Sequence, residues 1–403
     1  MATDVFEYNL VSFHLVKGIC AKCANMDFCA CSFVAMLWIM PRVTLKDVAQ
    51  QAGCSPGVVS AVLNKSKGNI GVAQATRERV LEVAKVLKYR PNHAARALAR
   101  RRTMTLGLAF APGITVKAGA LFQMRMIQGI ESVCHEHGYD ILLVQGNQSD
   151  SVESALLRLA PDRVDGLIMI LRNQLNEHYM DIVEDLKHVV SIGHTIDGDT
   201  YPAVLYDNDG AMMLAIDHLI AQQASRIGFL GECRSQPHGD NLARRNAFRQ
   251  ILTDRQMTVN DQWIHCRDMR ADVCSQPWAG DAFREGYFGT RYIFEHADTK
   301  PDALVGYNDL AIAGALRYLT EAGFKCPQDC MLIGVDDSEF CTTSTPTLST
   351  ISQPLEAMGQ QAATMLLQMI EQDAQNFEAR PVTTQVLEPK LIARESTGVE
   401  RVM

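Results

Sequence analysis

The stretch of residues 44–64 constrains the fold more strongly than any other part of the chain. Thr44 can cap a short helix, and the apolar residues Val48 and Ala49 fall on one face of that helix at helical spacing. Gly53 then supplies a tight turn, because a glycine carries no Cβ penalty in the left-handed region of backbone conformation. The pattern therefore predicts a first helix that ends sharply at this glycine.

A second short helix follows the turn. Ser55 can cap it, and Pro56 occupies the first helical position, where a missing N–H costs nothing. Its inward-facing residues are predicted to be Val58, Val59, Val62 and Leu63. Two short helices joined by a glycine turn are typical of a helix-turn-helix, whose second helix fits the DNA major groove. On this stretch alone, the alternative is an ordinary helical hairpin packed against a core.

The charge distribution around this motif favours DNA. A third helix is predicted from Ala73 to Leu87, and a short basic helix from His93 to Arg102. From Arg42 to Thr103 there are 13 Lys or Arg against 3 Asp or Glu, a local charge of +10 in a chain of net −8, which leaves −18 elsewhere. A basic module on an acidic body is typical of a phosphate-binding head, although a charged stretch can also be a solvated face.

Phrases in this region resemble the lactose/galactose repressor (LacI/GalR) family of bacterial transcription regulators. They are Val-Thr-Leu-Lys-Asp-Val-Ala from 43, Val-Ser-Ala-Val-Leu-Asn from 59, Ala-Thr-Arg-Glu-Arg-Val from 75 and Tyr-Arg-Pro-Asn-His-Ala-Ala-Arg-Ala-Leu-Ala from 89. Later phrases match as well, among them Asp207-Asn-Asp-Gly, Ile333-Gly-Val-Asp-Asp and Leu391-Ile-Ala-Arg-Glu-Ser-Thr-Gly. The resemblance covers the chain from Met40 onward.

The body of the chain shows apolar runs that alternate with helical patterns. The runs are 105–111, 139–144, 166–170, 189–192, 226–231, 303–307 and 331–336. Such alternation predicts parallel sheets covered by helices on both faces. The expected fold is an all-α helix-turn-helix head with a hinge helix, followed by a two-lobed, periplasmic-binding-protein-like α/β core with doubly wound parallel sheets.

The expected domain limits follow from these patterns and from the resemblance. They are an atypical extension at 1–39, a helix-turn-helix domain at 42–90, a hinge helix and linker at 91–103, and an effector-binding and dimerisation core at 104–403. Lobe 1 is expected at about 104–224 and 352–376, and lobe 2 at about 225–350 and 382–396. The chain is expected to cross between the lobes near Ala224, near Ile351 and between Gln375 and Val382.

The first 39 residues fit nothing that follows. They contain Cys20, Cys23, Cys29 and Cys31 at spacings that match no trusted metal pattern. The apolar run Ser32 to Met40 is too short to span a bilayer and lacks the features of a signal peptide. We interpret this segment as an upstream translation artefact or a disordered extension. The 12 cysteines of the chain are scattered and are expected to be reduced in a cytoplasmic protein.

Polar residues that follow apolar runs mark a candidate effector site. Asn308 and Asp336 follow predicted strands, and Arg244 opens a predicted helix. In doubly wound sheets, ligands bind outside the carboxyl ends of the strands. The resemblance implies that Arg244 and Asp336 bind the effector, that Asn308 lies close to it and that Phe122 lines the cleft between the lobes. Each also has a structural alternative, such as a surface ion pair, a turn cap or core packing. Trp278 and Phe283 are weaker candidates for a closing loop.

The resemblance also implies how the head contacts DNA: a homodimer places its second helices in major grooves, and Leu98 wedges into the minor groove. The residues expected at DNA are Thr44, Ser55, Pro56, Gly57, Ser60, Ala61, Asn64, Lys65, Asn92, Ala94 and Leu98. The usual base-reading positions hold Pro56, Gly57 and Ala61, which offer no side-chain hydrogen bonds. We therefore predict that specificity depends on apolar contacts, DNA shape and the hinge.

These observations favour a ligand-responsive transcription regulator, a repressor by the resemblance, over two alternatives. A solute-binding protein would need an export signal and no basic head. An enzyme would be expected to show a phosphate-binding glycine loop, a His-Glu-x-x-His motif or a Gly-x-Ser-x-Gly motif, and none is found. The expected partners are operator DNA, a second copy of the chain and a small effector, with a sugar or sugar derivative favoured and a nucleobase as the alternative. No cofactor, metal or membrane is expected.

Overall fold

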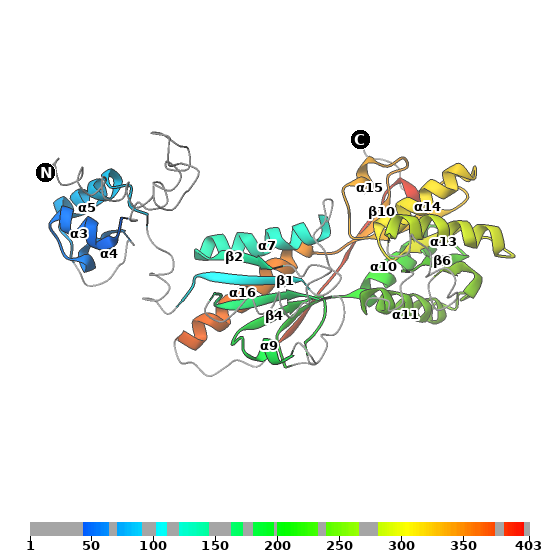
Figure 1. Ribbon diagram of the computed structural model, residues 1–403. Coiled ribbons are helices and arrows are strands. Elements are labelled where there is room, and N and C mark those ends of the chain that lie inside the picture. Colours follow the sequence, from blue (N-terminus) through cyan, green and yellow to red (C-terminus); the bar gives the residue numbers. More distant parts are fainter. Residues whose placement is uncertain are drawn as a thin grey trace, which may run out of the picture. The chain divides into compact units, whose positions relative to one another are not determined.

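The computed structural model describes residues 43–63, 71–90, 102–110, 121–144, 163–171, 180–196, 200–232, 239–265, 281–374 and 383–398. The chain divides into two compact units, Met1–Arg96 and Ala97–Met403. Figure 1 shows the helices of the first unit and the sheets of the second. In the ranges just given, no helix has both the length and the apolar character of a bilayer-spanning segment.

The described residues of the first unit form three helices, α3 (Leu45–Ala52), α4 (Pro56–Leu63) and α5 (Gln74–Val86). Gly53 ends α3 with φ +61°, the left-handed conformation that glycine adopts without strain. The buried core of the unit consists of Val48, Ala49, Ala52, Val59, Val62, Val80 and Ala84. The predicted helix-turn-helix and third helix are thus confirmed. The predicted basic helix from His93 to Arg102 lies almost entirely outside the described residues.

The second unit contains two six-stranded sheets, which we call sheet A and sheet B. Sheet A has the order β11-β5-β4-β3-β1-β2, and every neighbouring pair is parallel. Its strands are β1 (Thr105–Phe110), β2 (Asp140–Val144), β3 (Gly166–Ile170), β4 (Val189–Ile192), β5 (Ala203–Tyr206) and β11 (Thr384–Leu387). Sheet A together with α7 (Leu121–His137), α9 (Met180–Glu184) and α16 (Leu355–Ala374) forms lobe 1.

Sheet B has the order β12-β10-β9-β8-β6-β7 and is parallel except for the β10–β12 pair. Its strands are β6 (Ile227–Leu230), β7 (Ile264–His265), β8 (Ala303–Gly306), β9 (Met331–Val335), β10 (Ser349–Ser352) and β12 (Lys390–Ile392). Lobe 2 adds the helices α10 (Asn208–Ala221), α11 (Gly239–Asp254), α13 (Ala282–His296), α14 (Asp309–Glu321) and α15 (Phe340–Thr343). The short 3-10 turns Asp261–Trp263 and Glu395–Thr397 also belong to it.

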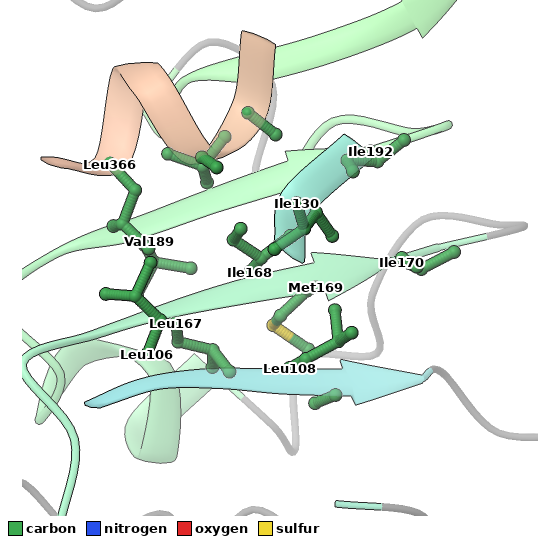
Figure 2. Close-up of a cluster of buried hydrophobic side chains, with 14 of the residues drawn as sticks. Leu106, Leu108, Ile130, Leu167, Ile168, Met169, Ile170, Val189, Ile192 and Leu366 are labelled. Atoms are coloured by element: carbon green, nitrogen blue, oxygen red, sulfur yellow. The ribbon is translucent and has the colours of Figure 1, made fainter. Parts of the chain in front are cut away.

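Helices pack against both sheets, as the apolar runs predict. In Figure 2, side chains of β1, β3 and β4 meet Ile130 of α7 and Leu366 of α16 in one cluster. In sheet B, alternate residues of a strand pack on opposite faces. Val305 contributes to the cluster shared with α10 and α11, whereas Leu304 contributes to the cluster shared with α13 and α14. This alternation is the period of a strand, so the predicted doubly wound architecture is confirmed.

The chain crosses between the lobes at places that differ from the prediction in two of three cases. The first crossing lies at Asp207, because α10 packs into the core of sheet B. A crossing near Ala224 is therefore wrong. The second lies between Ser352 and Leu355. The third lies between β11, which pairs with β5 in sheet A, and β12, which pairs with β10 in sheet B. The predicted crossing between Gln375 and Val382 is wrong because the pairing of β11 keeps the chain in lobe 1 up to Leu387.

Candidate functional site

The first candidate site is the surface of α4 in the head. The helix before it is held by a capping box, in which the Thr44 hydroxyl accepts from Asp47 N at 3.3 Å and Thr44 N donates to the Asp47 carboxylate at 2.7 Å. At the start of α4, the Ser55 hydroxyl accepts from Val58 N at 3.4 Å. These caps fix where each helix begins, so they set which residues α4 presents to solvent.

The exposed start of α4 is formed by small residues. Ser55, Pro56 and Gly57 are exposed, whereas Ser60 and Ala61 are half-buried. Thr44 is also exposed. Because these side chains are small, the main chain of α4 can approach DNA closely, but the surface offers few side-chain hydrogen bonds for base recognition. The remaining residues predicted at DNA lie outside the described part of the chain: Asn64, Lys65, Asn92, Ala94 and Leu98.

The second candidate site is the carboxyl edge of sheet B. Asn308 caps α14 immediately after β8, and its Oδ1 accepts from Ala311 N at 2.9 Å. Asp336 follows β9 directly and accepts from Gln353 Nε2 at 2.7 Å. Because carboxyl ends of neighbouring parallel strands share one edge, the two predicted residues lie at the same edge of the sheet. The cap at Asn308 confirms that this side chain has a structural role as well.

Arg244 reaches this edge from within α11, which begins at Gly239, so the expectation that Arg244 opens the helix is wrong. It is 5% exposed, with Nε donating to Asn208 Oδ1 at 2.8 Å and Nη1 donating to the carbonyl oxygen of Tyr307 at 2.5 Å. Tyr307 precedes Asn308, so the guanidinium group lies against the main chain of the same loop. The guanidinium group is buried and both acceptors are neutral oxygens, so the alternative role in a surface ion pair does not apply.

The fourth predicted effector residue lies in lobe 1. Phe122, near the start of α7, is half-buried, and its ring centroid lies 6.0 Å from that of Tyr206. Tyr206 ends β5 and is followed by the first crossing to lobe 2. Of the two weaker candidates, Phe283 lies on α13 with 39% exposure, and Trp278 is outside the described residues.

Several residues of this edge escaped the prediction. Asn208, which accepts from Arg244, follows β5 and so carried the same signal as Asn308, a polar residue after an apolar run. Gln353, which donates to Asp336, gave no such signal, because the strand before it, Ser349–Ser352, is not an apolar run. Arg394 donates to Asp337 Oδ1 at 2.7 Å and to the carbonyl oxygen of Leu348 at 2.8 Å. Nothing in its local sequence indicates this pairing.

A buried carboxylate lies behind the Asp336 loop. Asp309 is 1% exposed and accepts from Ser338 N at 2.8 Å and from the Thr350 hydroxyl at 2.6 Å. Burial raises the pKa of this carboxyl from 3.8 to about 6, against the opposing effect of the hydrogen bonds from Ser338 and Thr350. The carboxylate thus anchors the loop after β9 from inside lobe 2.

The raised pKa of Asp309 predicts a pH effect on stability. Between the unfolded and folded pKa values the folded chain binds more protons than the unfolded chain, so this group's contribution to the free energy of unfolding falls as pH rises from about 4 to about 6. We expect urea unfolding to show wild type losing stability relative to Asp309→Asn as pH rises from about 4 to about 6. A difference between the two proteins that does not change with pH would contradict this.

Comparison with known proteins identifies the family. A model of bacterial regulatory proteins of the lacI family matches residues 44–92, and a periplasmic binding protein-like domain matches residues 216–397. The HTH-type transcriptional repressor PurR of Edwardsiella ictaluri is 30% identical over 365 residues, covering 88% of this chain and 97% of that protein. The chain belongs to the LacI family. It is a ligand-responsive, DNA-binding regulator, and the prediction that it is not an enzyme is confirmed by these relatives.

Further relatives of this LacI-family regulator agree. PurR of Vibrio cholerae is 28% identical over 350 residues, covering 84% of this chain and 95% of that protein. A complex of the transcriptional regulator CelR with cellobiose superposes with a TM-score of 0.62 at 27% identity, covering 88% of this chain and 100% of that chain. The lac repressor dimer bound to operator and the anti-inducer ONPF has a TM-score of 0.71 at 23% identity, covering 89% and 99%, which supports the fold.

Proposed function

We propose that the chain forms a homodimer that binds a pseudo-palindromic operator and represses transcription in the cytoplasm. An effector bound between the lobes would control the affinity for DNA. The observation that carries this proposal is the meeting of Arg244, Asn308 and Asp336 at the carboxyl edge of sheet B, in a chain with a helix-turn-helix head. This edge is where ligands bind in doubly wound sheets.

At the effector site, Arg244, Asn308 and Asp336 supply the polar groups, and Phe122 supplies an apolar wall. An arginine fork donates to hydroxyl or carboxylate oxygens, and an aspartate accepts from hydroxyl or ring N–H groups. A neutral sugar presents hydroxyls to both. The cellobiose bound by CelR favours a sugar or sugar derivative here as well. A nucleobase remains the second candidate, because its ring N–H groups can donate to Asp336.

At the DNA end, the expected contacts come from α4, the loop after it and the hinge segment 91–103. Thr44 and the exposed Ser55, Pro56 and Gly57 would face the major groove, with Ser60 and Ala61 beside them. Asn64 would remain a polar candidate for base contact and Lys65 would contact phosphates, while Asn92, Ala94 and Leu98 would occupy the minor groove. The local charge of +10 supports phosphate binding. Selection of binding sites from random duplexes tests the prediction that specificity depends on apolar contacts, DNA shape and the hinge. Strong base preferences throughout both outer half-sites would contradict that prediction.

The effector proposal predicts the effect of replacing Arg244. A thermal-shift screen with cellobiose, galactose, glucuronate and adenine first identifies a compound that stabilises the full chain and changes its salt-sensitive affinity for the selected duplex. Arg244→Met should then weaken binding of that compound by about 100-fold, because charge-assisted hydrogen bonds contribute roughly 1.5–3 kcal/mol each. Affinity for DNA without the compound should change less than about 3-fold, since the head is a separate unit.

A matched control is available on the same helix. Arg249 of α11 forms a surface ion pair with Asp261, so Arg249→Met removes an equal charge without touching the carboxyl edge. It should bind the compound like wild type, because exposed ion pairs contribute little. Equal affinities of Arg244→Met and Arg249→Met for the compound would overturn the assignment of Arg244.

A further inference from the structure

The loop after β9 has an unusual backbone. Asp336 has φ +116° and Asp337 has φ +54°, so two consecutive residues with side chains occupy positive φ. Such conformations are strained and persist only where surrounding contacts hold them. Within lobe 2 these contacts are Asp336 N to the carbonyl oxygen of Ile351 at 2.9 Å, Asp337 N to Thr350 Oγ1 at 3.2 Å and the Arg394 pair with Asp337.

One further contact reaches this loop from lobe 1. Nη1 of Arg125, on α7, donates to the carbonyl oxygen of Asp336 at 3.2 Å and to that of Asp337 at 3.4 Å. The positive φ values turn two successive carbonyl groups toward one donor. Because arginine does not lose its proton in proteins, these hydrogen bonds are charge-assisted at any pH at which the chain folds.

The other end of this contact is rigid. Met126 and Ile130, which follow Arg125 on α7, are 0% exposed in the core of lobe 1. At Gly129, α7 lies against the main chain of α16 at Glu356, and at Gly359 α16 lies against the main chain of α7 at Met126. A close-packed helix pair moves as a unit. If Arg125 moves together with the loop after β9, the displacement is therefore transmitted to lobe 1 as a whole.

We propose that Arg125 is a positioning residue that links the two lobes, holding the strained Asp336–Asp337 backbone and making the arrangement of the lobes depend on it. The inference rests on the proposed function, in which the Asp336 side chain binds the effector. Asp336 then makes both contacts, because its carboxylate binds the effector and its carbonyl oxygen accepts a hydrogen bond from Arg125. By thermodynamic reciprocity, an effector that changes the loop changes the strength of the link, and the link changes effector affinity equally.

Hydrogen exchange measures the link without any effector. In the full chain, Arg125→Met should accelerate exchange of the peptide 331–343 at least about 5-fold, because the amides of 336–338 lose the support of lobe 1. Arg125→Lys should give an intermediate rate, since an ammonium group can reach one carbonyl but lacks the planar fork. Gln128→Met, at an exposed position on the same helix, should match wild type. Equal exchange in Arg125→Met and Gln128→Met would overturn the proposal.

The regulatory part is tested with the compound from the thermal-shift panel named above. For Arg125→Met, the change in DNA affinity that this compound produces should fall to less than about one third of the wild-type change. Accelerated loop exchange with an unchanged DNA response would overturn the regulatory part. If wild type binds neither duplex nor compound, the proposed function fails, whereas the exchange experiment still decides whether Arg125 holds the loop.

Discussion

Val59→Asp should lower operator affinity by at least about 100-fold while leaving the second unit folded. Val59 is 0% exposed and lies at the centre of a core of seven buried residues. A carboxylate placed there has no buried partner of opposite charge in that cluster, and burying an unpaired charge costs more than a domain of about 50 residues can supply. We therefore expect the head to unfold, and α4 with it.

The measurement is fluorescence anisotropy with the selected duplex, together with far-UV circular dichroism of the full chain. Val86→Asp is the matched control, because Val86 lies on α5 of the same unit with 62% exposure. It introduces the same residue at the surface and should weaken DNA binding less than about 5-fold. Similar losses in the two variants would show that added negative charge, and not the core of the head, decides binding.

Gly129→Val should lower the free energy of unfolding of lobe 1 by about 3 kcal/mol or more, because it overpacks a close contact between two helices. A Cβ atom at Gly129 would overlap the carbonyl oxygen of Glu356 on α16. Its neighbours there are main-chain atoms, so no side chain can move aside, and α7 and α16 must separate. Gly359 makes the reciprocal approach to Met126, which means that the two glycines together set the distance between these helices.

Urea unfolding followed by circular dichroism measures this loss. Gln128→Val places the same side chain at the neighbouring exposed position of α7 and should cost less than about 1 kcal/mol, the difference in helix propensity. If Gly129→Val unfolds at the same urea concentration as Gln128→Val, the close approach of the two helices is not needed for stability. Lobe 2 contains the same kind of close helix contact, since Gly286 and Gly314 lie against main-chain oxygens of the facing helix in the α13–α14 pair.

The local elements could be predicted from the sequence because their signals are local. The runs 166–170 and 189–192 become β3 and β4 with unchanged limits, and Gly53 ends α3 as expected. Asn308 and Asp336 were found by a similar route, since a polar residue after an apolar run lies at a strand's carboxyl end. The family phrases added the roles that these positions have in relatives.

The crossings between the lobes could not be predicted in the same way. The helix α10 has a largely apolar sequence, and nothing within it tells whether sheet A or sheet B will cover its apolar residues. The strand β11 is short and mostly exposed, so its pairing with β5 depends on hydrogen bonds to residues about 180 positions away. Both errors arise where long-range packing decides between two sheets of similar character.

The helix-turn-helix, most of the strands and helices, and the strand ends at which polar residues gather follow from local sequence, because spacing, capping and turn chemistry act over a few residues. The sheet that α10 joins, the hydrogen bond between Asn208 and Arg244, and the support that Arg125 gives to the backbone of Asp336 and Asp337 depend on long-range packing. These contacts join residues up to 212 positions apart. The local sequence around a long side chain does not show which partner that side chain will contact. Two carbonyl groups form a binding site only when the fold turns them toward the same guanidinium group.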